Sequence, residues 1–132
     1  MTGLHAKKAV QLDLLGPSVV VACGPPVQLE RLPDTTLLAL SNSGESRELR
    51  DPLIFCARND IPVIGVTQRP QSFLGRHSAV CLTMPKVAEA CPNGLAPTTS
   101  TLMSLAMGDA LAMVLMDRRG FTREDFGLHH PG

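Results

Sequence analysis

Four short runs of apolar residues constrain the fold of this chain more than any other feature. They occupy residues 18–22, 37–40, 62–66 and 79–82 and are rich in Val, Leu and Ile. None of them alternates apolar with polar side chains, which is typical of strands buried on both faces of a parallel sheet. The sequence therefore predicts a parallel sheet of about four strands.

Helical patterns lie around these runs. Residues 3–15 end at Gly16-Pro17, a pair that stops helices, and residues 45–59 carry Pro52 in the first turns, where a missing N–H costs least. We expect residues 99–119 to form a helix deep in the core, because their apolar residues include Leu102, Leu105, Ala106, Ala110, Met113, Val114 and Met116. The alternation predicts an α/β fold, a three-layer α/β/α sandwich, as a single domain over residues 1–132.

The composition argues against several classes of partner. Twelve basic and twelve acidic residues balance, and Trp and Tyr are absent, so neither nucleic acid nor an anionic membrane is expected. No apolar run approaches the length of a membrane span, and no signal core follows the basic N-terminus. We expect a cytoplasmic protein with no nucleic-acid or membrane partner.

The cysteine spacing argues against a metal or disulfide framework. Cys23, Cys56, Cys81 and Cys91 form no C-x-x-C pair. Buried reduced thiols are the simpler interpretation, in agreement with a reducing compartment. His5 and His77 have no obvious partners in the sequence and are interpreted as surface residues.

A hydroxyl-rich turn follows the second apolar run and is the strongest candidate for a binding site. The turn places Ser41, Asn42, Ser43 and Ser46 around Gly44, immediately before the predicted helix. Free backbone N–H groups, the helix dipole and several hydroxyls would converge there and favour a phosphate. An ordinary N-cap is the alternative, although a cap needs only one such side chain. In open α/β sheets, ligands bind beyond the carboxyl ends of the strands, where this turn lies.

A second group of polar residues follows the last apolar run. A loop with two prolines and a glycine places Glu89 at the same strand edge, and Thr98 and Thr99 then begin the long helix as caps or as further donors. Glu48, one turn into its helix, complements the dipole or faces a ligand. His130, in the terminal His-Pro-Gly, is weak evidence alone.

Several motifs together resemble the sugar isomerase (SIS) domain of bacterial D-arabinose 5-phosphate isomerases. They are Ser41–Ser46 with Glu48, Glu89-Ala90-Cys91-Pro92, Gly94-Leu95-Ala96-Pro97-Thr98, Met107-Gly108-Asp109-Ala110, Gly120-Phe121-Thr122, and His130-Pro131-Gly132. The likeness runs from about Thr36 to the end of the chain. It implies a three-layer fold, a dimer or tetramer, and interconversion of D-ribulose 5-phosphate and D-arabinose 5-phosphate, which leads to the lipopolysaccharide sugar Kdo.

The resemblance also implies roles for individual residues. Ser41, Ser43 and Ser46, with Asn42, would hold the phosphate, and Thr98 and Thr99 would add substrate contacts. Isomerisation through an enediol needs a base and a group that stabilises the oxyanion. Glu89 would be the base, His130 would act at the sugar oxygens, and Glu48 would orient hydroxyls or His130. No cofactor and no metal is implied.

The sequence departs from the family pattern near its N-terminus. Met1-Thr2-Gly3 stands where the family has Lys-Ser-Gly, so the active-site lysine and the first family strand have no counterpart. We therefore expect the strands at 18–22 and 37–40 to pair directly. Three hypotheses stay open: an active isomerase, a non-catalytic sugar-phosphate-binding domain, and an assembly module that only forms oligomers.

Overall fold

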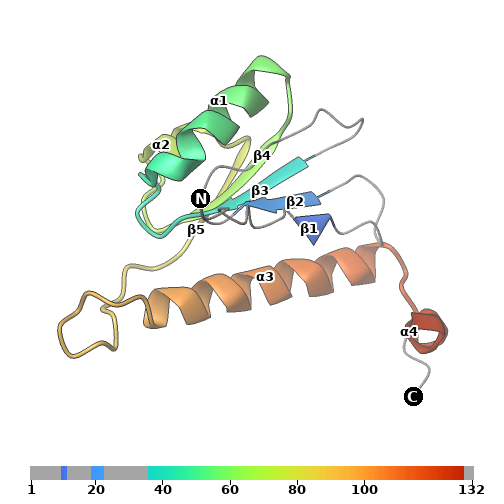
Figure 1. Cartoon of the computed structure of the whole chain (residues 1–132). Coiled ribbons are helices and arrows are strands. Elements are labelled where there is room, and N and C mark those ends of the chain that lie inside the picture. The colour runs from blue at the N-terminus through green and yellow to red at the C-terminus, as the bar shows by residue number, and fades with distance from the viewer. Residues whose placement is uncertain (1–9, 12–18, 23–35, 130–132) are drawn as a thin grey trace, which may run out of the picture. The chain divides into compact units, whose positions relative to one another are not determined.

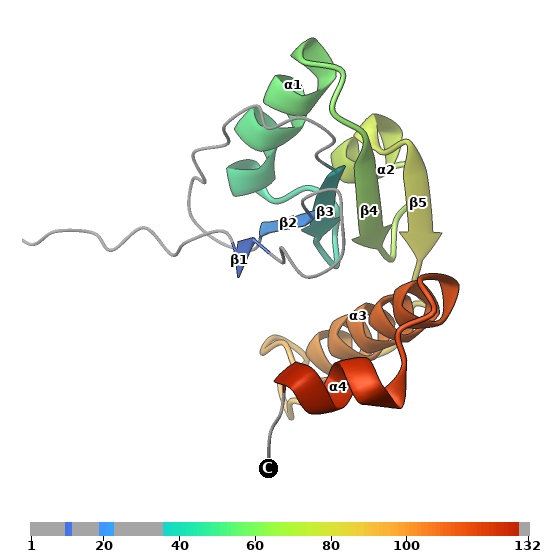
Figure 2. The ribbon, with the colours of Figure 1, turned by 90° about the vertical axis from the view of Figure 1, so that its right-hand side faces the viewer.

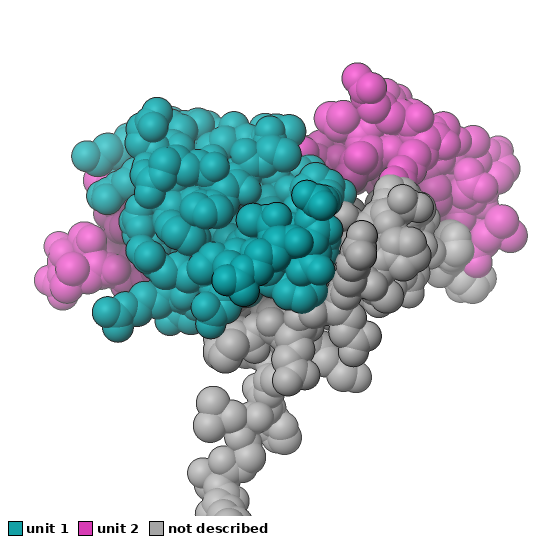
Figure 3. Space-filling view, turned by 90° about the horizontal axis from the view of Figure 1, so that it is seen from above, with its two compact units in different colours: residues 1–87 teal, residues 88–132 magenta. Residues whose placement is uncertain are grey.

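The computed structural model describes residues 10–11, 19–22 and 36–129. The chain divides into two compact units, residues 1–87 and 88–132, which are coloured separately in Figure 3. The expected single domain over 1–132 stays a prediction.

The first unit is built on a sheet of five strands in sequence order (Figures 1 and 2). The strands are β1 (Val10–Gln11), β2 (Val19–Ala22), β3 (Thr36–Leu40), β4 (Val63–Thr67) and β5 (Val80–Thr83). Strands β2 to β5 pair in parallel, with Val20 opposite Leu37, Leu38 opposite Ile64, and Val66 opposite Leu82. The parallel sheet and the direct pairing of β2 with β3 confirm the sequence predictions.

The helix predicted over residues 3–15 is wrong at Val10–Gln11. These two residues form β1 and pair antiparallel with Val20 and Val21 of β2. The local pattern of these residues favours a helix, but they pair instead with β2, about ten residues further along the chain. A short sequence pattern does not contain information on such a partner. The other positions of that predicted helix lie outside the described residues.

One face of the sheet is covered by two helices (Figures 1 and 2). The 3₁₀ turn η2 (Arg47–Leu49) leads into α1 (Arg50–Arg58), which confirms the helix predicted at 45–59, and α2 (Phe73–His77) follows β4. The core between them consists of Leu37 and Ala39 of β3, Val63 of β4, Leu49, Leu53 and Cys56 of η2 and α1, and Leu74 of α2. Helix α2 is absent from the sequence prediction, because five residues are too few to show a helical period. The α/β class is confirmed, whereas the second helical layer of the expected sandwich stays a prediction.

Burial within the sheet is less uniform than expected. Along β3, buried and half-buried residues alternate, and β5 is half-buried or exposed throughout. Val80 is 52% exposed, as suits a strand at the end of the sheet order. Among the described residues, β4 comes closest to the expected two-sided burial, with four of its five residues buried.

The second unit contains a loop, the long helix α3 (Thr99–Arg118) and the short helix α4 (Arg123–His129). The boundaries of α3 confirm the predicted helix, but its expected burial is wrong: Leu102 is 67% exposed, Leu105 62% and Met113 57%. Of the helix residues, all of which the structure describes, Ser100 alone is buried. Apolar helix surface requires partners that cover it, and the second unit by itself does not supply them.

The expectation that no segment has the length of a membrane span is wrong for α3 on length and composition alone. The helix has 20 residues and is apolar enough to cross a bilayer. A single helix of this kind is weak evidence for a membrane span, because core helices of soluble proteins pass the same test.

Candidate functional site

The turn between β3 and η2 is closed by its own hydroxyl groups. Ser41 Oγ and Ser46 Oγ lie 2.8 Å apart, and Ser41 Oγ also accepts a hydrogen bond from the Gly44 N–H at 3.1 Å. Ser43 Oγ accepts from the Glu45 N–H at 3.2 Å. Ser41 is buried, whereas Asn42 and Ser43 are exposed. The serines therefore define the shape of the turn, and Asn42 and Ser43 present their side chains to solvent.

Gly44 allows this turn to lie against the next loop. Its φ of +67° is in the left-handed region, which favours glycine. A Cβ atom at this position would lie 1.9 Å from Ser72 Oγ and 2.9 Å from Thr67 Oγ1. Only a glycine combines this backbone conformation with so close a neighbour.

Hydrogen bonds join the turn to the loop that follows β4. The Asn42 carbonyl oxygen accepts from the Gln68 N–H at 3.1 Å and from Thr67 Oγ1 at 3.2 Å. The Gly44 carbonyl oxygen accepts from the Leu74 N–H at 2.9 Å. Because β3 and β4 are parallel neighbours, both loops lie at the carboxyl edge of the sheet. The two loops form one hydrogen-bonded unit at the edge where α/β sheets bind ligands.

The start of η2 offers unsatisfied donors beside the turn. Among the described residues, no hydrogen bond reaches the backbone N–H groups of Arg47 and Glu48, and Ser46 makes no side-chain cap bond. The Gln68 amide nitrogen is buried and also has no partner in the described part of the chain. The N–H groups at a helix start and the positive end of its dipole attract anions. The arrangement can accept a phosphate group, as the sequence predicts.

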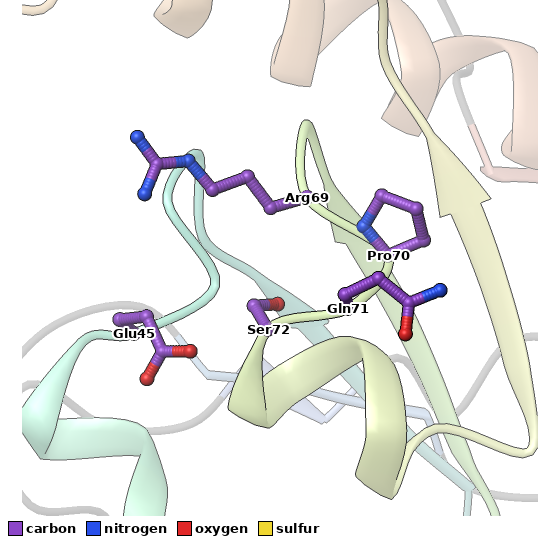
Figure 4. A pocket seen from close by; sticks show the side chains of 5 residues that line it. All are labelled: Glu45, Arg69, Pro70, Gln71 and Ser72. Atoms are coloured by element: carbon purple, nitrogen blue, oxygen red, sulfur yellow. The ribbon is translucent and has the colours of Figure 1, made fainter.

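A pocket of about 450 Å³ opens beside this turn and is shown in Figure 4. Its lining residues are Glu45, Arg69, Pro70, Gln71 and Ser72. Glu45 Oε1 accepts from the Phe73 N–H at 2.9 Å, and Glu45 Oε2 lies 3.4 Å from an Arg50 guanidinium nitrogen. The Arg50 guanidinium also lies 4.6 Å from the centre of the Phe73 ring. Glu45 thus links the turn to both helices on this face of the sheet.

In the second unit, Glu89 binds the N-terminus of α3. Its Oε2 atom accepts from the Thr98 N–H at 2.8 Å, from Thr98 Oγ1 at 3.1 Å and from the Ser100 N–H at 3.2 Å. Hydrogen bonds from Ser100 and Thr98 lower the pKa of Glu89 to about 2. Thr98 lies at the N-cap position of α3, as the sequence predicts, but the side chain that accepts from the N–H groups there is that of Glu89. In this conformation Glu89 is ionised but is a weak proton acceptor.

The structure brings only part of the predicted site together. Ser41, Asn42, Ser43 and Ser46 share one turn, and Glu48 follows on η2 with an exposed side chain. Glu89, Thr98 and Thr99 belong to the second unit, and Thr98 contacts Glu89 directly. His130 lies outside the described residues. The catalytic roles of Glu48, Glu89 and His130 stay predictions.

Sequence reasoning missed the pocket residues of the loop after β4. Arg69 and Ser72 follow Thr67, the last residue of β4, and line the pocket with Glu45. The rule that placed the serine turn beyond the end of β3 applies equally to the end of β4. Within the described part of the chain, no group of three or more His, Cys, Asp or Glu side chains could hold a metal ion.

Residues 32–114 match the SIS domain family. This match includes the serine turn, Glu89 and α3 as far as Val114. We therefore interpret α3 as a helix of this domain.

Curated relatives match the same part of the chain. The arabinose 5-phosphate isomerase KdsD of Escherichia coli O157:H7 is 50% identical over 100 residues, which are 76% of this chain and 30% of the relative. KdsD of Salmonella typhi is 50% identical over 102 residues, with the same coverage, and KdsD of Francisella tularensis is 45% identical over 95 residues, 72% of this chain and 29% of the relative. The chain thus spans about 30% of the length of these relatives.

Solved structures resemble the fold. The c3406 protein of Escherichia coli CFT073, solved in complex with arabinose 5-phosphate, aligns with a TM-score of 0.70 and 36% identity, covering 74% of this chain and 52% of that chain. A putative phosphosugar isomerase from Bacteroides fragilis aligns with a TM-score of 0.70 and 36% identity, covering 75% of this chain and 53% of that chain.

Proposed function

This chain belongs to the SIS domain family, and on that premise we propose that it binds a sugar phosphate at the serine turn and interconverts D-arabinose 5-phosphate and D-ribulose 5-phosphate. The observation that carries the proposal is the closed turn at residues 41–46, beside N–H groups of Arg47 and Glu48 that are free among the described residues. A phosphate monoester matches these donors in charge and geometry. The curated relatives named arabinose 5-phosphate isomerase support the choice of substrate.

The proposed chemistry divides the work between acidic side chains and an imidazole. A base moves the proton between neighbouring carbons through an enediol, and a second polar group stabilises the oxyanion. We assign Glu89 as the base, His130 as the group at the sugar oxygens and Glu48 as an orienting group, and we assign Thr98 and Thr99 to substrate contacts. For Glu89 to accept the proton, its hydrogen bonds to the start of α3 must loosen when substrate binds, because they hold its pKa at about 2.

The contacts of Glu89 favour a second candidate function, a sugar-phosphate-binding domain without turnover. A carboxylate that receives hydrogen bonds from Thr98 and Ser100 serves α3 and is not available to the substrate. In this case the serine turn binds the ester, and Glu89 has a purely structural role.

An isomerase assay combined with a binding measurement separates the two candidates. Purified protein is supplied with D-ribulose 5-phosphate while D-arabinose 5-phosphate is followed, and the thermal midpoint is recorded with D-arabinose 5-phosphate and with D-arabinose. Turnover that is lost in Glu89→Gln supports the isomerase. No turnover, with a thermal shift that requires the phosphate and is lost in Ser43→Ala, supports the binding domain.

Ser78→Ala is a matched control for Ser43→Ala. Ser78 Oγ donates to the Leu74 carbonyl oxygen at 2.7 Å and lies just before β5, at the amino edge of the sheet. The control removes one hydroxyl away from the serine turn, so it should keep the thermal shift. Equal loss of the shift in both variants would contradict a phosphate site at the turn.

The assembly and location of the protein are also proposals. The exposed apolar surface of α3 supports a homo-oligomer, either a dimer or a tetramer. The balanced charge and the cysteine pattern support a cytoplasmic location.

A further inference from the structure

We propose that Arg69 is a binding residue that contacts the anionic group of the sugar phosphate from the pocket beside the serine turn. This inference rests on the proposed function and extends it by adding a cationic contact in the first unit. The inference is based on where Arg69 lies, on the hydrogen bonds that hold its backbone, and on a guanidinium that pairs with no acidic side chain among the described residues.

The placement follows from the sheet. The serine turn follows β3, and Arg69 lies two residues beyond Thr67, the last residue of β4. Because β3 and β4 are adjacent and parallel, these two loops meet at one edge. Arg69 and Glu45, a residue of the turn segment, line the same pocket of about 450 Å³. In the view of Figure 4, the extended Arg69 side chain carries its guanidinium toward the side of the pocket on which Glu45 lies.

The backbone of Arg69 is held firmly against the turn. Its N–H donates to Thr67 Oγ1 at 3.1 Å, and this hydroxyl in turn donates to the Asn42 carbonyl oxygen at 3.2 Å. The Arg69 carbonyl oxygen accepts from the Ser72 N–H at 2.9 Å, and Pro70 restricts the next peptide. The anchored backbone fixes the position from which the Arg69 side chain extends, and the long side chain itself is ordered when it binds.

The charges in the pocket leave Arg69 unmatched. The two ionised residues that line it are Glu45 and Arg69. Both Glu45 oxygens are occupied, one by the Phe73 N–H and the other by Arg50. Among the described residues, no hydrogen bond or ion pair is made by the Arg69 guanidinium, and Arg69 is exposed. Arg69 therefore carries the one charge among the lining residues that no described residue pairs with.

The chemistry of a guanidinium suits a phosphate ester. Its planar donors can pair with two phosphate oxygens at once, and it stays charged at every physiological pH. The serine turn would supply short neutral donors, and Arg69 would supply the charge. Inorganic phosphate and D-arabinose 5-phosphate share this chemistry, whereas D-arabinose lacks it.

Isothermal titration calorimetry of the full chain tests the inference. The probes are D-arabinose 5-phosphate and inorganic phosphate, and the proteins are the wild type, Arg69→Gln, Ser43→Ala and the control Arg58→Gln. Arg58 is an exposed arginine at the end of α1 that does not line the pocket. We expect Arg69→Gln to raise the Kd for both probes about tenfold and to weaken its dependence on salt. Arg58→Gln should keep the wild-type Kd.

The outcomes distinguish this inference from the proposed function. Without any binding to the wild type, the proposed function itself fails. If the wild type binds, and if Ser43→Ala weakens this binding while Arg69→Gln leaves it unchanged, the phosphate site is supported and the role of Arg69 is overturned. Because the Arg69 side chain makes no bond in the described residues, the unliganded thermal midpoint of Arg69→Gln should equal that of the wild type.

Discussion

At the residue scale, Gly44 is the position where the serine turn depends most on a single side chain. Gly44→Ala would place a methyl group 1.9 Å from Ser72 Oγ and 2.5 Å from Ser72 Cβ, at a φ of +67°. We expect the free energy of unfolding to fall by about 3 kcal/mol, as backbone strain and overpacking add. Urea unfolding of the wild type and the variant measures this loss.

Gly94→Ala provides the comparison that separates the two causes. Gly94 has a similar φ of +64°, but a Cβ atom there would have no neighbour within 4 Å. The Gly94→Ala variant should lose about 1 kcal/mol of the free energy of unfolding, from backbone strain alone. Equal losses in the two variants would mean that the contact with Ser72 does not constrain the turn.

The cysteines should differ sharply in reactivity. Hydrogen bonds from the backbone N–H groups of Ala96 and Leu95 lower the pKa of the Cys91 thiol, which is half-buried. Burial raises the pKa of the Cys56 thiol, which is fully shielded. The thiolate is the reactive form, so iodoacetamide at pH 7 should label Cys91 in the folded protein and Cys56 only after denaturation. Peptide mass spectrometry checks this order, and faster native labelling of Cys56 would contradict it.

The sequence predicts individual site residues only where they belong to a recognisable local pattern. The serine turn is visible because three serines and an asparagine surround one glycine after an apolar run. Glu45 and Arg69 escape notice because each looks like an ordinary surface charge. Their significance arises from pairing between β3 and β4, which brings two loops together that are about 25 residues apart in the chain.

At the element scale, the cap of α3 makes the stability of that helix dependent on pH. The pKa of Glu89 is about 2 in the folded chain, below its ordinary value of 4.5. A lowered pKa means that the carboxylate stabilises the fold above about pH 5, and that this contribution disappears as the pH falls toward 2. Glu89→Gln should therefore lower the thermal midpoint at pH 7 and have little effect near pH 2.

A second substitution on the same helix controls for the loss of charge. Asp109 is exposed in the middle of α3, away from its first turn, so Asp109→Asn should leave the cap intact. Carbon NMR of the Glu89 carboxyl group gives the pKa directly. A measured pKa near 4.5 would show that the hydrogen bonds to Thr98 and Ser100 do not persist in solution.

Helices and strands that are long or that have a clear local sequence pattern were predicted best. The described parallel strands begin and end within one residue of their predicted ranges, because unbroken Val, Leu and Ile runs identify them. Helices α1 and α3 were also predicted, whereas α2 was too short, and β1 forms by pairing with β2, which its own two residues do not indicate. The burial of α3 could not be predicted, because an apolar composition indicates that a helix needs partners and does not identify them.

For the molecule as a whole, the exposed apolar surface of α3 is the feature that the second unit leaves unexplained. Leu102, Leu105, Met113 and Val114 are each more than half exposed. Apolar surface of this kind is unfavourable in water and is usually covered by another protein surface. A second copy of the chain is the partner that we propose, in agreement with the predicted homo-oligomer.

If the chain forms a homo-oligomer, the wild-type protein should have a mass above that of the 14.1 kDa monomer. Light scattering coupled to size-exclusion chromatography measures this mass. Replacing Leu105 with Glu places a charge on the apolar surface and should shift the protein toward the monomer, because burying an unpaired charge is costly. Thr101→Glu, at an exposed polar position of the same helix, is the matched control and should keep the wild-type mass. If Leu105→Glu also keeps that mass, the interface lies elsewhere, and a monomeric wild type would refute the proposed assembly.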